Sequence, residues 1–162
     1  CSYLDERGLV DYVSVIGGTS ASASGWIHVF PPMAVPHAYL AGHSAAVKQH
    51  IKVPVLVTGR INQPQLAEQI LANGQADMVG MVRAMIADPE FANKTLDGRA
   101  DEIRACIGCN QACVGHRLAH FPVSCIQHPE TGRELDYGER RRTSAPRHVV
   151  VVGAGPGQGR FK

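Results

Sequence analysis

The sequence alternates between short apolar runs rich in valine and segments with helical periodicity, and this alternation limits the folds open to it. The apolar runs cover residues 11–16, 53–57 and 77–82. Helical patterns cover residues 37–51, 62–73 and 88–96. Runs that are apolar along nearly their whole length are typical of strands covered on both faces, as in a parallel sheet. The order of strand, helix, strand, helix, strand, helix therefore predicts an α/β fold.

One long segment interrupts this pattern. Residues 19–36 are rich in serine, glycine and proline, which predicts a loop. Long loops in compact domains often serve function, and this one contains Trp26, His28 and Phe30. We expect it either to lie over a cofactor or substrate or to pack against the sheet.

The number of strand–helix units suggests part of a larger architecture. A (β/α)₈ TIM barrel needs eight such units, so residues 1–105 are predicted to form only the C-terminal βα units of one. The chain begins with Cys1 and stops shortly after a glycine loop, so we interpret it as a fragment of a longer protein. Such a piece would expose sheet edges, and we expect poor solubility or stability from it alone.

Four of the five cysteines lie within twenty residues, at Cys106, Cys109, Cys113 and Cys125. This clustering differs from the even cysteine spread of disulfide-stapled secreted domains. Four thiolates bind zinc or a 4Fe-4S cluster. Structural zinc usually uses two C-x2-C pairs, whereas three close thiolates with a remote fourth suit a cubane cluster. Residues 106–128 are therefore predicted to be a 4Fe-4S segment, with zinc, or with reduced or disulfide-bonded cysteines, as alternatives.

Three histidines lie close to these cysteines. They are His116, His120 and His128. Because four thiols already suffice as ligands, we interpret the histidines as surface or hydrogen-bonding residues.

An arginine stands at the end of each of two predicted strands, in the pairs Gly59-Arg60 and Val82-Arg83. The active site of a (β/α)₈ barrel lies at the carboxyl ends of its strands, often with a phosphate near the last two loops. Backbone N–H groups and a guanidinium bind phosphate well. The alternative is two solvated arginines.

The last part of the chain predicts a polar linker over residues 129–147 and a strand over 148–152. Gly153 and Gly155 follow this strand, as at the start of a dinucleotide-binding unit. The usual spacing requires a third glycine at position 158, where the chain has Gln158 between two glycines. We interpret residues 148–162 as the start of a truncated Rossmann-like domain.

Composition excludes several classes of function. A net charge of +2 is too small to favour nucleic acid or an acidic membrane surface as partner. No apolar run is long enough to cross a bilayer, and the first residues lack the features of a signal peptide. We expect a cytoplasmic protein with no nucleic acid and no membrane partner. The sequence contains no P-loop and no H-E-x-x-H pattern.

Several stretches together resemble one known family. They are VPVLVTGRINQPQLAEQILANGQADMVGMVRAMIADPEF, GRADEIRACIGCNQAC, the remote Cys125 and VVVVGAGPG. They are similar to the iron–sulfur branch of the old yellow enzyme family, the NADH:flavin oxidoreductases. That branch includes dienoyl-CoA reductases, amine dehydrogenases, and demethylases of dimethylglycine and N-methylproline.

The resemblance implies cofactors and residues that hold them. It implies an FMN-binding TIM barrel followed by a 4Fe-4S cluster on the four clustered cysteines. Arg83, with the backbone around Val82, would hold the FMN phosphate, and Gly59 and Arg60 would lie beside it. A glycine loop for FAD or NAD(P)H in a second domain would follow, at Gly153, Gly155 and Gly157.

The resemblance also implies a reaction, in which electrons pass between FMN and the cluster. The segment from Cys113 to Cys125 looks most like the demethylases, so we expect oxidative N-demethylation of a small amine or N-methyl amino acid. The alternative in the family is NAD(P)H-dependent enoyl or dienoyl reduction. Alternatives of other classes are a zinc-binding structural module and an inactive partial chain. An electron-transfer partner and a homo-oligomer are expected for the full-length protein, and the catalytic acid and base would lie on earlier strands.

Overall fold

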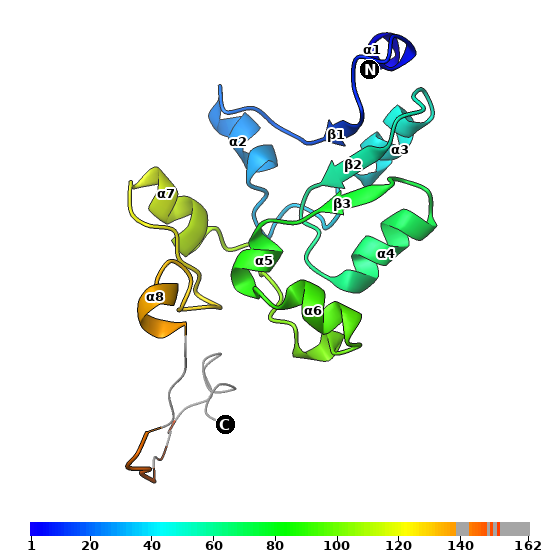
Figure 1. Cartoon of the computed structure of the whole chain (residues 1–162). Coiled ribbons are helices and arrows are strands. Elements are labelled where there is room, and N and C mark those ends of the chain that lie inside the picture. The colour runs from blue at the N-terminus through cyan, green and yellow to red at the C-terminus, as the bar shows by residue number, and fades with distance from the viewer. Residues whose placement is uncertain (139–142, 149, 151, 153–162) are drawn as a thin grey trace.

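Three parallel strands form the sheet of the computed structural model, which describes residues 1–138, 143–148, 150 and 152. The strands β1 (Val13–Val15), β2 (Val55–Thr58) and β3 (Met78–Gly80) lie in the order β1-β2-β3 (Figure 1). Val13 pairs with Val55 and Val57 pairs with Val79, so all three strands run in the same direction. The predicted parallel α/β arrangement is confirmed, with strands shorter than the apolar runs.

Helices follow the strands in chain order. They are α3 (Ala41–Lys48), α4 (Pro64–Ala72), α5 (Arg83–Ala87) and α6 (Phe91–Leu96). The helix expected over 37–51 begins only at Ala41, because Ala38 has a left-handed backbone. The helix expected over 88–96 begins at Phe91, and α5 precedes it directly after β3.

The helix predicted over 62–73 begins two residues later, at Pro64, so Asn62 does not cap it as its residue type suggests. Gln63 precedes α4 with an extended backbone, and Pro64 occupies the first helical turn. The Asn62 side chain instead donates a hydrogen bond to the carbonyl of Cys106, at 2.6 Å. It therefore joins the loop after β2 to the cysteine segment.

The prediction of a loop over 19–36 was only partly correct, because α2 (Ala23–Val29) lies within it. Ser22 caps this helix, since its hydroxyl accepts a hydrogen bond from the Gly25 N–H at 3.1 Å. The Trp26 indole donates to the Ser20 carbonyl at 2.8 Å. The sequence did not predict this helix because serine and glycine have low intrinsic helix propensity.

Short helical segments complete the described chain. They are α1 (Ser2–Glu6), a 3₁₀ turn (Ala100–Glu102), a π-helical turn (Gln111–Gly115), α7 (His116–Leu118) and α8 (Glu134–Tyr137). Residues 149 and 151 of the strand expected over 148–152 lie outside the described residues, as do Gly153, Gly155 and Gly157. The dinucleotide-binding loop therefore stays a prediction.

The core lies around β2, the central strand. Val55 and Val57 are fully buried, and Ile70 of α4 and Leu40 before α3 are buried with them. Burying an aliphatic side chain of this size contributes about 1.5–3 kcal/mol. The two helices α3 and α4 lie beside the sheet in Figure 1, and they contribute Ala41, Ala67 and Ile70 to this core.

A buried carboxylate, Asp88, fixes the path from the sheet to the cysteine segment. Its side chain is 0% exposed and binds the Lys94 ammonium at 2.6 Å and the Arg104 N–H at 2.9 Å. It also accepts from the Glu90 N–H at 3.1 Å. Burial by itself would raise the pKa of Asp88, but these partners outweigh it and hold that pKa below its ordinary value. Asp88 therefore ties the end of α5 to α6 and to the residue two positions before Cys106.

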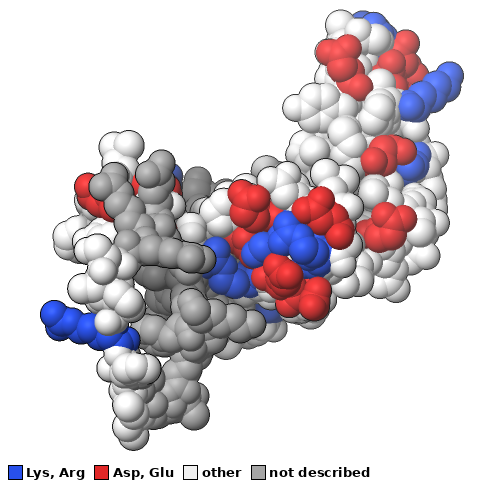
Figure 2. Space-filling model, turned by 60° about the horizontal axis from the view of Figure 1, so that its bottom comes forward, with Lys and Arg blue, Asp and Glu red and all other residues white. Residues whose placement is uncertain are grey.

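Charged side chains of both signs are mixed on the surface. Figure 2 shows one face on which Lys and Arg side chains lie among Asp and Glu side chains. Among the described residues, no helix has the length and apolar content needed to cross a membrane.

Replacing Asp88 should test how far this carboxylate holds the structure together. We expect Asp88→Asn to lower the free energy of unfolding by about 3–5 kcal/mol near neutral pH, because it leaves Lys94 without its ionic partner. Since the pKa of Asp88 is lowered on folding, its contribution is complete above the pKa of the unfolded chain. That contribution is lost as pH falls through the folded pKa, so the two proteins should converge in acid.

Urea unfolding of both proteins at several pH values measures this difference. Asp97→Asn is the matched control, because Asp97 forms an exposed ion pair with Arg99 and should change stability little. A stability loss of equal size in both variants would contradict the role given to Asp88.

Candidate functional site

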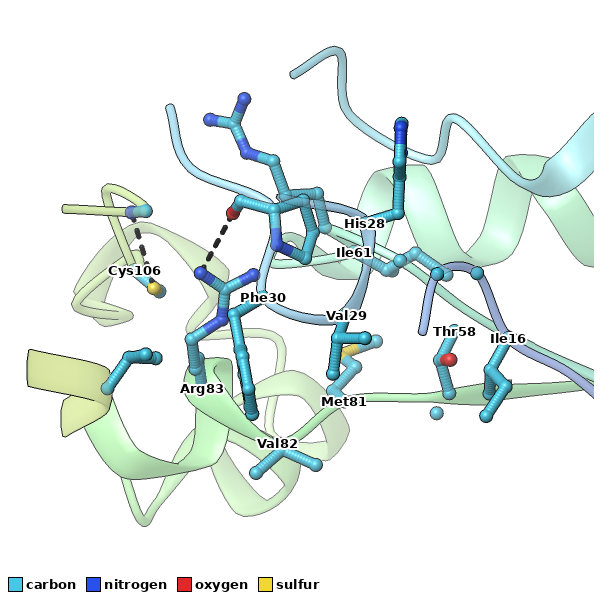
Figure 3. Close-up of a pocket in the computed structure, with 18 of the residues that line it drawn as sticks. Ile16, His28, Val29, Phe30, Thr58, Ile61, Met81, Val82, Arg83 and Cys106 are labelled. Atoms are coloured by element: carbon cyan, nitrogen blue, oxygen red, sulfur yellow. Dashed lines mark hydrogen bonds between the residues drawn. The ribbon is translucent and has the colours of Figure 1, made fainter. Parts of the chain in front are cut away.

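A pocket of about 750 Å³ lies at the carboxyl ends of the three strands. Ile16 follows β1, Thr58 ends β2, and Met81 and Val82 follow β3, and all four line the pocket (Figure 3). Carboxyl ends of parallel strands meet at one edge of a sheet, where α/β proteins commonly bind ligands. The pocket therefore lies where the sequence predicted a site.

All four predicted strand-end residues line this pocket. They are Gly59, Arg60, Val82 and Arg83. The Val82 side chain is 73% exposed, so Val82 contributes to the pocket mainly through the position of its backbone.

Two strand ends have room only for glycine, at Gly59 and Gly80. Gly59 has a φ of +133°, and a Cβ there would lie 2.9 Å from the Tyr39 ring. A Cβ on Gly80 would lie 2.4 Å from the Thr58 methyl group. Neither position accepts a side chain without displacing the pocket wall.

Arg83 keeps part of its guanidinium free. Its Nη1 donates to the Pro31 carbonyl at 2.9 Å and to the Asn110 side-chain oxygen at 2.5 Å. Among the described residues its Nη2 and Nε have no hydrogen-bond partner. Arg83 is therefore both anchored and able to bind an anion in the pocket.

Arg60 is committed to a neighbouring loop. Its Nη1 donates to the Met33 carbonyl at 2.7 Å and to the Val35 carbonyl, and its Nη2 lies 3.3 Å from the His37 ring. It therefore holds residues 33–37 against the pocket. Neither Arg60 nor Arg83 is a simple solvated side chain.

A third arginine, Arg117, also lines the pocket, and the sequence analysis did not single it out. Arg117 belongs to α7, between the third and fourth clustered cysteines. The sequence could have indicated its place only through the expectation that the cysteines lie close to the strand ends. No Asp or Glu is among the described residues that line the pocket. The pocket is therefore cationic, which favours an anionic occupant.

His28 and Tyr39 form another part of the wall. The Tyr39 hydroxyl donates to the His28 carbonyl at 2.6 Å, and the two rings lie 5.8 Å apart. Burial raises the pKa of Tyr39, and the charge of Arg83 partly opposes this shift. Tyr39 is therefore a neutral hydrogen-bond donor at physiological pH. His28 is carried by α2, so the segment expected to be a loop over the site does line it.

All four clustered cysteines line a second, smaller cavity. Its volume is about 20 Å³, and its other walls include Ile86, Ile107 and Ile126. The chain brings Cys125 back to the first three because the Ser124 N–H donates to the Ala112 carbonyl at 2.8 Å. All four are free thiols.

The donor set of this cavity fits a thiolate-bound metal centre. Four soft ligands face one apolar space, and the Gly108 N–H donates to the Cys106 sulfur at 3.4 Å. Among the described residues, no three His, Cys, Asp or Glu side chains are already arranged as a metal-binding group. Burial raises the pKa of Cys113, so this side chain is a protonated thiol when no metal is bound.

Two of the nearby histidines have hydrogen-bonding roles, as expected. The His116 Nδ1 lies 3.1 Å from the Pro122 carbonyl. The His128 Nδ1 lies 2.8 Å from the Thr131 hydroxyl, which donates to the Ile86 carbonyl. These bonds secure the segment against α5.

The two cavities share part of their walls. Four residues line both of them, namely Arg83, Ile86, Cys106 and Cys113. In Figure 3 the Arg83 and Cys106 side chains lie on the same side of the larger pocket. A molecule bound at the strand ends would therefore be a neighbour of the cysteines.

A parallel sheet with a pocket at the carboxyl ends of its strands is the arrangement in which open α/β proteins bind their ligands. The comparison with family models gives the family. The chain belongs to the NADH:flavin oxidoreductase / NADH oxidase family, whose model matches residues 31–102. Members of this family are flavin-dependent oxidoreductases.

Individual relatives support this assignment. A metal reductase of Desulforamulus reducens is 42% identical over 156 residues, which is 96% of this chain and 22% of the relative. An N,N-dimethylglycine/sarcosine dehydrogenase of Chromohalobacter salexigens is 36% identical over 159 residues, which is 96% of this chain and 23% of the relative.

A solved structure agrees with them. The complex of 2-naphthoyl-CoA reductase with 2-naphthoyl-CoA matches with a TM-score of 0.74 and 28% identity, over 84% of this chain and 20% of that one. The chain spans about a fifth of the length of these relatives.

The steric requirement for glycine at position 80 can be tested by adding a methyl group. We expect Gly80→Ala to destabilise the fold by about 1–3 kcal/mol, because its Cβ would overlap the Thr58 side chain. Gly42→Ala is the control, since a Cβ at this position in α3 meets no atom within 4 Å. That variant should gain about 0.5–1 kcal/mol from helix propensity. Thermal unfolding measures both, and equal effects would show that Gly80 is not sterically required.

Proposed function

We propose that this chain is the part of a flavin-dependent oxidoreductase that binds FMN at the strand ends and a 4Fe-4S cluster through Cys106, Cys109, Cys113 and Cys125. One observation carries the proposal. All four thiols line a cavity whose wall is shared with the cationic pocket. The family supports the flavin, and the soft donor set supports the cluster.

The proposal includes the larger architecture and the remaining expectations. The three βα units would be the C-terminal part of a (β/α)₈ barrel, and residues 148–162 would begin a domain for FAD or NAD(P)H. An electron-transfer partner and a homo-oligomer in the cytoplasm belong to the same proposal for the whole protein.

The residues of the larger pocket would divide the work of holding FMN. Arg83 would donate its free N–H groups to the phosphate, together with the backbone around Val82. Gly59 would allow close approach, and Arg60 would hold residues 33–37 in place. FMN, when bound, supplies hydride and single-electron chemistry, and the cluster supplies single-electron transfer.

The second cavity would provide the cluster with four thiolates and an apolar lining. Ile86, Ile107 and Ile126 supply that lining, with Ile107 and Ile126 also exposed at the surface, and the Gly108 N–H adds a hydrogen bond to a sulfur. Hydrogen bonds and burial of this kind set the potential of a thiolate-bound cluster.

For the substrate we propose an N-methyl amino acid or small N-methylamine, which loses its methyl group by oxidation. The likeness to the dimethylglycine/sarcosine dehydrogenase supports this class. A pocket with arginines and no carboxylate favours a substrate that carries its own carboxylate, and Arg117 would be free to bind it.

A reductase is the second candidate. The metal reductase has the higher identity, and the solved relative is named a reductase of an aromatic acyl-CoA. In this case the protein would use NAD(P)H to reduce an enoyl or dienoyl substrate.

The cofactors can be measured directly. We expect about four irons and four sulfides per chain, with one FMN, in the anaerobically purified protein. Cys109→Ser should lose iron and sulfide, because it removes one ligand. Cys1→Ser is the control, since Cys1 is exposed and lies far from the cluster in sequence. Zinc at about one per chain without sulfide would instead support a structural zinc module and overturn the cluster.

The two candidate reactions give different products. We expect formaldehyde and the demethylated amino acid from dimethylglycine or N-methylproline in the presence of an artificial one-electron acceptor. Cleavage of the oxidised N-methyl group by water releases these two products in equal amounts. Oxidation of NAD(P)H that depends on an enoyl-CoA, without formaldehyde from either amino acid, would contradict demethylation and support the reductase.

A further inference from the structure

One residue of the cysteine segment forms hydrogen bonds to two residues that line the larger pocket. Asn110 lies between Cys109 and Cys113 and has a left-handed backbone, with a φ of +57°. Its side-chain N–H donates to the Phe30 carbonyl at 2.7 Å. Its side-chain oxygen accepts from Arg83 Nη1 at 2.5 Å. Both ends of this amide therefore contact residues that line the pocket.

These contacts close a ring of hydrogen bonds. Arg83 Nη1 also donates to the Pro31 carbonyl at 2.9 Å, and Figure 3 shows this bond beside Phe30. Asn110 thus joins Arg83 to Phe30 and Pro31, which belong to the segment after α2. Because all three bonds use one amide and one guanidinium nitrogen, the orientation of Arg83 depends on where the cysteine segment holds Asn110.

We propose that Asn110 is a positioning residue that couples the two sites, so that ligation of the four cysteines orients Arg83 for anion binding. This inference rests on the proposed function, because it takes FMN and the thiolate-bound cluster as the two occupants. Coupling between two sites is reciprocal, so FMN would also stabilise the loaded cysteine segment. In this proposal the hydrogen bonds of the Asn110 amide transmit the coupling between the two sites, and the wall shared by the two cavities is not sufficient for it.

A second bond between the two regions makes the role of Asn110 separable. The buried Asn62 side chain donates to the Cys106 carbonyl at 2.6 Å, independently of Asn110 and Arg83. Loss of the Asn110 side chain therefore leaves the cysteine segment attached to the loop after β2. We expect the segment to fold and bind iron without Asn110 while Arg83 loses its fixed orientation.

The test compares FMN affinity between holoprotein and protein depleted of iron and sulfide. Asn110→Gly removes the side chain and accepts the left-handed backbone. Asn110→Asp keeps an oxygen for Arg83 and loses the donor to Phe30. His120→Gly is the control, because His120 has a φ of +61° in the same segment and does not line the pocket.

FMN fluorescence quenching gives the dissociation constants. In the wild type and in His120→Gly, removal of iron and sulfide should weaken FMN binding about tenfold. This is the effect expected from losing one hydrogen bond to a charged group. In Asn110→Gly, binding should be weakened about tenfold in the loaded protein and should no longer depend on loading. Asn110→Asp should keep the dependence on loading, because its carboxylate still accepts from Arg83, while its negative charge lowers FMN affinity in both the loaded and the depleted protein.

The outcomes separate the inference from the proposed function. An unchanged ratio of affinities in Asn110→Gly, or equal FMN affinity in loaded and depleted wild type, overturns the coupling alone. A wild type that binds no FMN, or carries no iron and sulfide, overturns the proposed function and the coupling with it. If Asn110→Gly fails to retain iron, Asn110→Asp decides, because a loss of dependence on loading there contradicts coupling through the Arg83 bond.

Discussion

Parallel pairing of β2 with both of its neighbours places three strand ends at one edge, and the site depends on this arrangement. Val57 pairs with Val15 on one side and with Val79 on the other, so Gly17, Gly59 and Met81 leave the sheet close together. The buried Val57 of β2 stabilises the pairing because it packs in one core cluster with Ile70 and Leu40. A pocket at that edge follows from strand direction, and its cationic character follows from the arginines placed after the strands.

Part of this arrangement could be predicted from the sequence because it depends on local patterns. Valine-rich runs predicted the three strands, and their order along the chain predicted parallel pairing. Gly59, Arg60 and Arg83 lie within three residues of a strand end, so their place on the pocket wall required only the strand ends to be correct. The cysteines could be grouped because their spacing in the sequence is short.

Other parts depend on contacts that no local pattern records. The Ser-rich α2 forms because Ser22 caps it and Trp26 anchors it, although its residues favour a loop. Asn62 looks like a helix cap in sequence, but its partner is the carbonyl of a residue 44 positions away. Arg117 lines the pocket, and Asn110 bonds to two residues of its wall, only because the chain turns back after Cys109. Tertiary contacts decide the roles of these residues, and single-sequence reasoning has no access to them.

The contacts of Asp88 also have a consequence for the order in which the molecule is built. Its hydrogen-bond partners Glu90, Lys94 and Arg104 lie 2, 6 and 16 residues away along the chain, whereas Asn110 and Phe30 are 80 residues apart. Short loops close with little loss of chain entropy, and contacts of low sequence separation form early in folding. The turn around Asp88 can thus form before the sheet edge is complete and present the first cysteine at a fixed position. The contact between the distant segments around Asn110 and Phe30 would then form last.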